Sequence, residues 1–222
     1  DGFTGSDCSL DDSAMADLQA LRETMCISIY ETLAIQDITA DVVTGRASSI
    51  SGILLNIDQI SDIALSNCAT ALAETVILAV EIDPAYTAGN AEVSLSISNA
   101  LSSVLAKGSA IETTLMDLTL SAVDSQNAAI QALLALGEGA QCAPTDNINV
   151  CAAKALADEV ATYGPAQSDQ DAFNGVDNTE VVPVVGDERR RLAESGAQTV
   201  VQVSVVQQTN NPYGATSANS SS

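Results

Sequence analysis

The chain has 222 residues and a formal net charge of −22, from 29 acidic and 7 basic residues. So acidic a surface repels phosphate backbones and anionic lipids, which excludes nucleic acid as an expected partner and favours divalent cations or basic protein surfaces. Apolar residues make up 46 % of the chain, too many for a disordered acidic segment. No uninterrupted apolar run reaches the length of a membrane span, so none is expected in this segment.

The cysteines indicate an oxidising environment. The chain has five cysteines, no histidine and no Cys-x-x-Cys pair, a pattern that argues against a zinc site. Disulfides are therefore the first interpretation, and they imply an extracellular or cell-surface location. Buried free thiols in a cytosolic protein are the alternative.

Two long helices are predicted before residue 83. The first spans residues 9–38, with Ser9 or Asp11 as its cap, and presents one apolar face: Met15, Leu18, Leu21, Met25, Ile29 and Leu33. Residues 40–48 are interpreted as a break. A second helix then carries a continuous apolar stripe up to the stop signals Pro84 and Gly89: Ile50, Ile53, Leu54, Ile57, Ile60, Ala64, Cys68, Leu72, Val76 and Ala79.

Two cysteines lie on these helices. If the helices are antiparallel neighbours, Cys26 and Cys68 stand at similar heights, and the spacing predicts a disulfide between them. Two plain core residues are the alternative.

Two further helices follow, over residues 91–108 and 109–139. Their apolar faces are typical of helices buried on one side: Val93, Ile97, Leu101, Val104 and Leu105 in one, and Ile111, Leu115, Leu118, Ala122, Ile130, Leu133 and Leu134 in the other. Glycines at 108 and at 137 or 139 are the expected ends. Cys142 and Cys151 flank a turn-rich loop, which predicts a local disulfide, and a short helix is expected over residues 151–164.

The composition after residue 164 favours strands. Residues 180–185 read as a short edge or bulged strand because of Pro183. Residues 198–208 alternate apolar and polar side chains, as a half-buried strand does. The fold class is therefore mainly α: a disulfide-stapled helical bundle over residues 10–164, followed by the start of a β-rich, sandwich-like part over residues 165–222.

No residue pattern indicates catalysis. Without histidine there is no His-based triad, and no glycine-rich phosphate loop occurs, so we expect no enzyme and no cofactor. The window 169–180 places acids at the first, third and twelfth positions of a calcium loop. However, Phe173 and Asn174 stand where an oxygen ligand and glycine are needed. Loose calcium binding and a plain solvated loop both remain open for this window.

Two short motifs suggest modification. Arg189, Arg190 and Arg191 form a basic tract that is either a processing site or an exposed linker. Asn219 begins an Asn-Ser-Ser sequon and is a candidate glycosylation site.

The first residues resemble the end of an EGF-like module. That family closes with a Gly, an aromatic residue, another Gly and a last Cys, here Gly2, Phe3, Gly5 and Cys8. The resemblance implies that residues 1–9 end such a module. It also implies that Cys8 pairs with a cysteine upstream of this segment.

The order of helices and strands resembles the GAIN/REJ-type regions of large surface proteins. It is also similar to algal and protist EGF-containing mastigoneme (flagellar hair) proteins. The GAIN self-cleavage tripeptide needs a histidine, which this chain lacks. We therefore expect a non-enzymatic, extracellular structural or adhesive module of a larger surface or filament-forming glycoprotein, acting through self-association or protein partners. A ligand-binding receptor module for cell or gamete recognition is the alternative.

Overall fold

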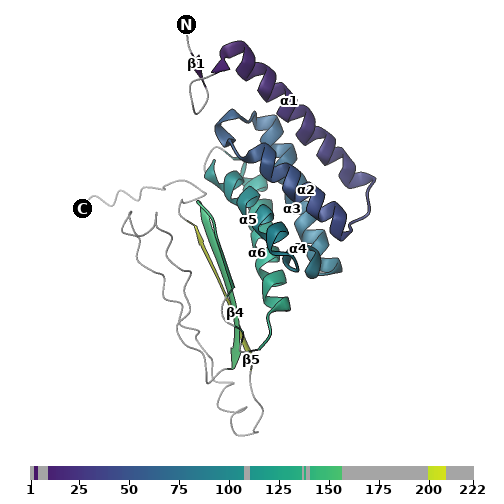
Figure 1. The fold of residues 1–222 in the computed structure, drawn as a ribbon, viewed down its shortest axis with the longest axis vertical. Helices are drawn as coiled ribbons and strands as arrows, with labels where there is room; N and C mark the ends of the chain where they lie inside the picture. The colour runs from purple at the N-terminus through teal and green to yellow at the C-terminus, as the bar shows by residue number, and fades with distance from the viewer. Residues whose placement is uncertain are drawn as a thin grey trace, which may run out of the picture.

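The protein is a bundle of helices with a small sheet against one side (Figure 1). The computed structural model describes residues 3–4, 10–107, 111–136, 138, 141–156 and 200–208. The helices are α1 (Asp12–Glu31), α2 (Ala40–Leu54), α3 (Asp62–Ile82), α4 (Ala85–Ala88), α5 (Ala91–Ala106) and α6 (Thr113–Leu133). Short 3₁₀ turns occupy Thr32–Ala34 and Ile57–Gln59. The strands are β1 (Phe3–Thr4), β2 (Leu10–Asp11), β3 (Gln141–Pro144), β4 (Ile148–Leu156) and β5 (Val200–Gln208). The mainly α fold class, with strands after the helices, is confirmed.

Helix α1 begins where the sequence predicts. The Asp11 carboxylate accepts a hydrogen bond from the Ala14 backbone N–H at 2.8 Å, so Asp11 is the cap. The helix ends at Glu31, earlier than expected. Its predicted apolar face is wrong at two positions, since Leu21 and Met25 are 57 % and 43 % exposed. Cys26 is the one residue of α1 that is fully buried among the residues the structure describes.

The predicted break over residues 40–48 is wrong, because these residues form most of α2. Thr39 caps the helix through its hydroxyl and the Val42 N–H. Val43, Ala47 and Ile50 follow at helical spacing and are buried. Gly45 sits on the exposed side, where the helix tolerates it at a cost of about 1 kcal/mol relative to Ala.

The predicted continuous helix from Ile50 to Ala79 is also wrong. Helix α2 ends at Leu54, and a new helix begins after Ser61, whose hydroxyl accepts from the Ala64 N–H at 3.1 Å. The apolar stripe runs across this junction because Ile60 is buried too. Hydrophobic spacing alone therefore did not reveal the interruption, although Asn56 and the Ser61 cap marked it.

Helix α3 is the centre of the bundle and packs against all five of the other helices. Its buried face is rich in alanine, which lets neighbouring helices approach closely: Ala64, Ala69, Ala71, Ala73 and Ala79. By length and composition alone α3 could cross a membrane, with a mean hydropathy of 1.7 over 18 residues. However, 56 % of that window is buried inside the protein, so its role as core helix accounts for its composition.

Helices α1 and α3 are joined by the Cys26–Cys68 disulfide, with a Cα–Cα distance of 4.8 Å. The predicted pairing is confirmed, but the antiparallel arrangement behind it is wrong. Glu23 accepts a hydrogen bond from Ser61, at the start of α3, and Cys26 is bonded to Cys68 further along. Since the residue numbers of these contacts rise together on the two helices, α1 and α3 run parallel. Helix α2, which lies between them in the sequence, runs back in the opposite direction.

Helix α5 follows the predicted pattern closely, and α6 follows it in part. All five predicted core residues of α5 are buried. In α6, Ala122 and Ile130 are buried, whereas Leu133 is 45 % exposed. The expected glycine ends at 108, 137 and 139 lie outside the described residues.

The predicted short helix at 151–164 is wrong from Cys151 to Leu156, because these residues form the greater part of β4. Strand β4 pairs antiparallel with β3 on one side and with β5 on the other. Its Ala-, Lys- and Leu-containing sequence favours a helix locally, but tertiary pairing overrides propensity. The predicted strand over 198–208 is confirmed as β5.

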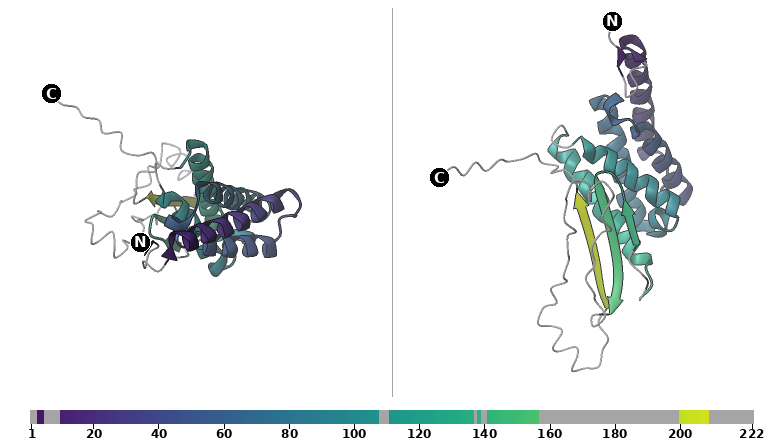
Figure 2. Two further views of the ribbon diagram at one scale, coloured as in Figure 1. Left: turned by 90° about the horizontal axis from the view of Figure 1, so that it is seen from above. Right: turned by 60° about the vertical axis from the view of Figure 1, so that its left-hand side comes forward.

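The sheet shares one hydrophobic core with the helices. Ile148, Val150 and Ala152 of β4 belong to the same buried cluster as the inner faces of α2, α3 and α5. At the tip of the hairpin, Asn147 donates from its backbone and its side chain to Ser102 of α5, at 3.0 and 3.2 Å. Two views place α1 on the side of the bundle away from the sheet (Figure 2).

The predicted Cys142–Cys151 disulfide is confirmed, and it links residues directly opposite each other on β3 and β4. Their Cα atoms are 4.1 Å apart, which is typical of a non-hydrogen-bonded antiparallel pair. The backbone N–H and C=O of Cys151 therefore point away from β3 and toward Val205 of β5. By alternation, Val203 also faces β4, whereas Gln202 directs its N–H outward.

The two disulfides should differ in their rate of reduction. Cys26 and Cys68 are both fully buried, whereas Cys142 is exposed. Because thiol–disulfide exchange requires access to a sulfur atom, millimolar dithiothreitol under native conditions should reduce Cys142–Cys151 at least about tenfold faster. Timed alkylation followed by peptide mass spectrometry measures both rates. In denaturant the difference should disappear, and faster native reduction of Cys26–Cys68 would contradict the described burial.

Candidate functional site

Among the predicted site residues, the structure describes only the four paired cysteines. They form two separate links, one inside the bundle and one at the edge of the sheet. Cys8, Asn219 and the tract Arg189–Arg191 lie outside the described residues, as do the calcium window 169–180 and the predicted strand 180–185.

Arg46 is the most unusual polar residue in the described part of the chain. It projects from α2 and is only 5 % exposed. One terminal nitrogen, Nη1, donates to the Thr75 hydroxyl of α3 at 3.1 Å. The other, Nη2, donates to the Thr32 carbonyl and hydroxyl, each at 3.0 Å, and to the Gln36 amide oxygen at 3.3 Å. Arg46 thus connects the end of α1 to α2 and α3.

No carboxylate neutralises Arg46 among the described residues, because every partner is a neutral oxygen. Its Nε–H is buried and has no hydrogen-bond partner in the described part of the chain. Burial lowers the pKa of the Arg46 guanidinium from its ordinary value, since the charged form loses solvation. The carbonyl groups at the C-terminus of α1 supply partial negative charge, which favours a cation at this place.

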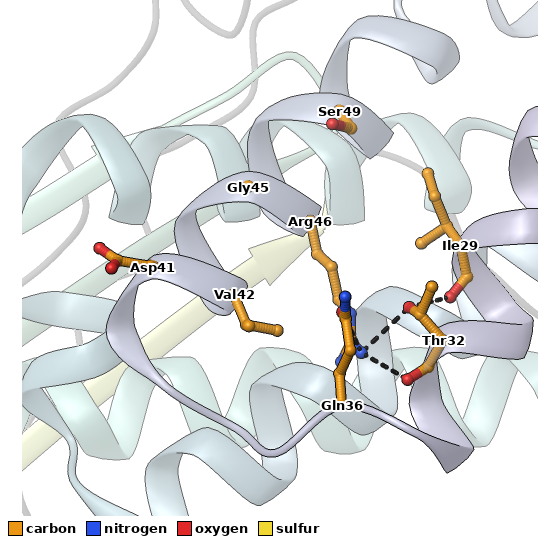
Figure 3. Close-up of a pocket in the computed structure, with 8 residues that line it drawn as sticks. All are labelled: Ile29, Thr32, Gln36, Asp41, Val42, Gly45, Arg46 and Ser49. Carbon is orange, nitrogen blue, oxygen red and sulfur yellow. Dashed lines mark hydrogen bonds between the residues drawn. The ribbon is translucent and has the colours of Figure 1, made fainter.

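Arg46 lies at the side of a hollow of about 380 Å³ between α1 and α2 (Figure 3). Figure 3 shows the Arg46 side chain reaching from α2 toward Thr32 and Gln36, with Ile29 opposite. The α2 side is lined by Asp41, Val42, Gly45 and Ser49. A Cβ atom added to Gly45 would meet nothing within 4 Å, so the glycine keeps this side open.

A second hollow, also of about 380 Å³, lies where the helices meet the sheet. Its walls come from the start of α5, from Ile130 of α6 and from strand β3. Ser94 and Gln141 are its polar side chains, and the Cys142 half of the disulfide lies at its border.

Buried polar groups continue behind this second hollow. Ser94 accepts a hydrogen bond at 2.9 Å from Gln126 of α6, which also donates to the Thr87 carbonyl at 3.3 Å. Three buried oxygens find no hydrogen-bond partner within the described ranges: Gln126 Oε1, Ser98 Oγ and Asn127 Oδ1. Such groups are usually satisfied by internal water molecules.

Two findings bear on the wider chemistry. Within the described residues, no group of three or more Cys, Asp or Glu side chains is placed to hold a metal ion. No family model, curated protein or solved structure matches the chain. The EGF-like, GAIN-like and mastigoneme resemblances therefore stay predictions.

One feature of the sequence indicates that Arg46 is buried, although the predicted break over residues 40–48 hides it. Position 46 follows the buried Val43 by three residues and precedes the buried Ile50 by four. It therefore lies on the buried face of a helix, where an arginine requires partners. Nothing in the sequence indicated that those partners would be neutral.

Replacing Gln36 with Glu should stabilise the protein. The new carboxylate would stand at the position of the amide oxygen, 3.3 Å from Arg46, and give the guanidinium a counter-charge. Because Gln36 is exposed, we expect a gain of only about 0.5–1 kcal/mol in the free energy of unfolding. Urea unfolding at pH 7 and low salt measures it. The gain should vanish at acidic pH, where the carboxyl is protonated in both folded and unfolded states.

The control is Gln131→Glu on α6, which makes the same charge change outside this hollow. It should leave stability unchanged or lower it slightly in so acidic a chain. Equal effects of the two variants would show that Arg46 needs no counter-charge.

Proposed function

We propose that this chain is a non-enzymatic extracellular module with a structural or adhesive role in a larger surface or filament-forming protein. It associates with copies of itself or with neighbouring chains. The observation that carries the proposal is strand β5, a nine-residue strand at the edge of the sheet. No described strand pairs with its outer edge.

The two edges of the sheet differ in their protection. Strand β3 has four residues and ends at Pro144, and both a short length and proline discourage further pairing. Strand β5 has neither protection, because its sequence, Val-Val-Gln-Val-Ser-Val-Val-Gln-Gln, contains no charge and no proline. An edge of this kind is suited to pairing with a strand from another chain.

The disulfides support an extracellular setting and a mechanical role. Two disulfides are compatible with a secreted protein, since cytosolic thiols are kept reduced. One joins two helices and the other joins two strands, so both layers are cross-linked. From loop length alone, they stabilise the fold by about 4 and about 3 kcal/mol. In the fuller form of this proposal, Cys8 belongs to an upstream EGF-like module and Asn219 carries a glycan.

The net negative charge of the chain opposes self-association, but strand β5 itself carries no charge that would add to the repulsion. Two molecules with a charge of −22 repel each other over the Debye length, about 8 Å at physiological salt. Pairing along β5 places no like charges directly opposite each other, because the strand has none. Association should therefore strengthen as salt is added.

A pair of proline variants tests the outer edge of β5. Gln202 directs its N–H outward, so Gln202→Pro removes a donor from the edge of β5 that no described strand pairs with, and it spares the pairing with β4. We expect it to weaken self-association at least about tenfold, with the melting temperature nearly unchanged. Sedimentation velocity across a concentration series in 0.5 M salt measures the association.

The matched variant is Val203→Pro, which removes a donor that faces β4. It should destabilise the sheet and lower the melting temperature. A wild-type protein that stays monomeric at high concentration, with salt and neighbouring modules present, would refute self-association. Equal association of wild type and Gln202→Pro would refute β5 as the joining surface.

The receptor-type alternative has one observation in its favour, the hollow between α5, α6 and β3. It lies where helices and sheet meet and contains the polar side chains of Ser94 and Gln141. A bulky Ser94→Trp variant fills it. If this variant, and not Gln202→Pro, prevented labelled protein from binding to the surface of its source cells, recognition would replace association as the function.

A further inference from the structure

The hollow beside Arg46 combines a buried cation with an opening to solvent. Arg46 is only 5 % exposed, and its four hydrogen-bond acceptors are uncharged. A buried charge without a counter-ion costs free energy that an anion of matching shape recovers. The guanidinium is planar and presents parallel N–H groups, a geometry that fits a carboxylate.

One partner of Arg46 is replaceable. The Gln36 amide oxygen makes the longest contact, at 3.3 Å, and Gln36 is an exposed residue. The Thr32 hydroxyl is less free, because it also donates to the Ile29 carbonyl at 2.6 Å. An incoming carboxylate would replace a neutral acceptor at Nη2 with a charged one, so that the hydrogen bond becomes an ion pair.

The lining of the hollow leaves space for such a group. A Cβ on Gly45 would meet nothing within 4 Å. Ser49, on the next turn of α2, also lines the hollow, at the end away from the terminal nitrogens of Arg46 (Figure 3). Asp41 is the acidic side chain in the lining. Its charge, added to the strongly acidic chain, disfavours dianions such as phosphate more than a single carboxylate.

We propose that the hollow between α1 and α2 is a binding site for one carboxylate group. The carboxylate displaces Gln36 from Arg46 Nη2. The group comes from a small organic acid or from an acidic side chain of a peptide, since both present the same two oxygens.

Acetate is the simplest probe. In two-dimensional ¹H–¹⁵N spectra the Nε–H of Arg46, assigned by its disappearance in Arg46→Lys, should shift saturably on titration with sodium acetate. For so small a ligand we expect a dissociation constant on the order of 1–10 mM. Sodium chloride at matched ionic strength should produce no saturable shift.

Two glycine variants separate the site from general salt effects. Gly45→Leu fills the hollow without removing any partner of Arg46, and it should weaken acetate binding at least about tenfold. Gly52→Leu is the matched control, because Gly52 is on the same helix, is equally open and does not line the hollow. It should bind as the wild type does. Both variants should fold, since leucine is the better helix former.

Two peptides identify the source of the group. Acetyl-Gly-Glu-Gly-amide binding at least about tenfold more tightly than acetate would indicate a peptide side chain, and equal affinities would indicate a free acid. Acetyl-Gly-Gln-Gly-amide should not bind. The proposal is overturned if acetate produces no saturable shift up to 100 mM, if chloride reproduces the shift, or if Gly45→Leu retains full affinity.

Discussion

Helix α1 is held to the rest of the protein by covalent and polar contacts at three heights along α3. Glu23 meets Ser61 at the start of α3, Cys26 is bonded to Cys68, and Arg46 links Thr32 to Thr75 further on. Apolar burial contributes less, because Cys26 is the one fully buried residue of α1 within the described chain. The disulfide therefore fixes the height of α1, and Arg46 fixes its end.

This attachment explains why the cysteine pairing could be predicted although the arrangement could not. Two cysteines on amphipathic helices are visible in the sequence, and only their faces need to meet. Whether the two helices run parallel or antiparallel depends on whether another helix lies between them in the chain. The predicted break over residues 40–48 leaves no helix there, whereas Thr39 caps the complete helix α2. Once α2 is inserted, α3 must run in the direction of α1.

Other elements also differ in whether the local sequence pattern or tertiary packing determines them. The inner faces of α5 and α6 follow largely from spacing, and β5 follows from alternation. Strand β4 does not, because Ala152, Ala153 and Lys154 have no strand preference and are placed by pairing with both neighbours. The Arg46 site could be predicted only in part from the sequence: the spacing of the apolar residues puts residue 46 on a buried helix face. Its neutral partners come from two separate segments, the turn after α1 (Thr32 and Gln36) and helix α3 (Thr75), and no local pattern predicts that they meet.

The chain has far more acidic than basic residues, and three features bear on this imbalance: the two disulfides, the uncharged strand β5 and the buried Arg46. Self-repulsion of −22 charges weakens a compact state, and covalent links oppose this without adding charge. Strand β5 stays uncharged where contact with another chain is proposed. Arg46 is one of only seven basic residues, yet it is buried inside the bundle, where it interacts with the partial negative charges at the end of α1. A role in stability alone would be met by a neutral donor such as glutamine. A full positive charge beside an open hollow is better explained if a carboxylate, abundant on any acidic neighbour, also binds there.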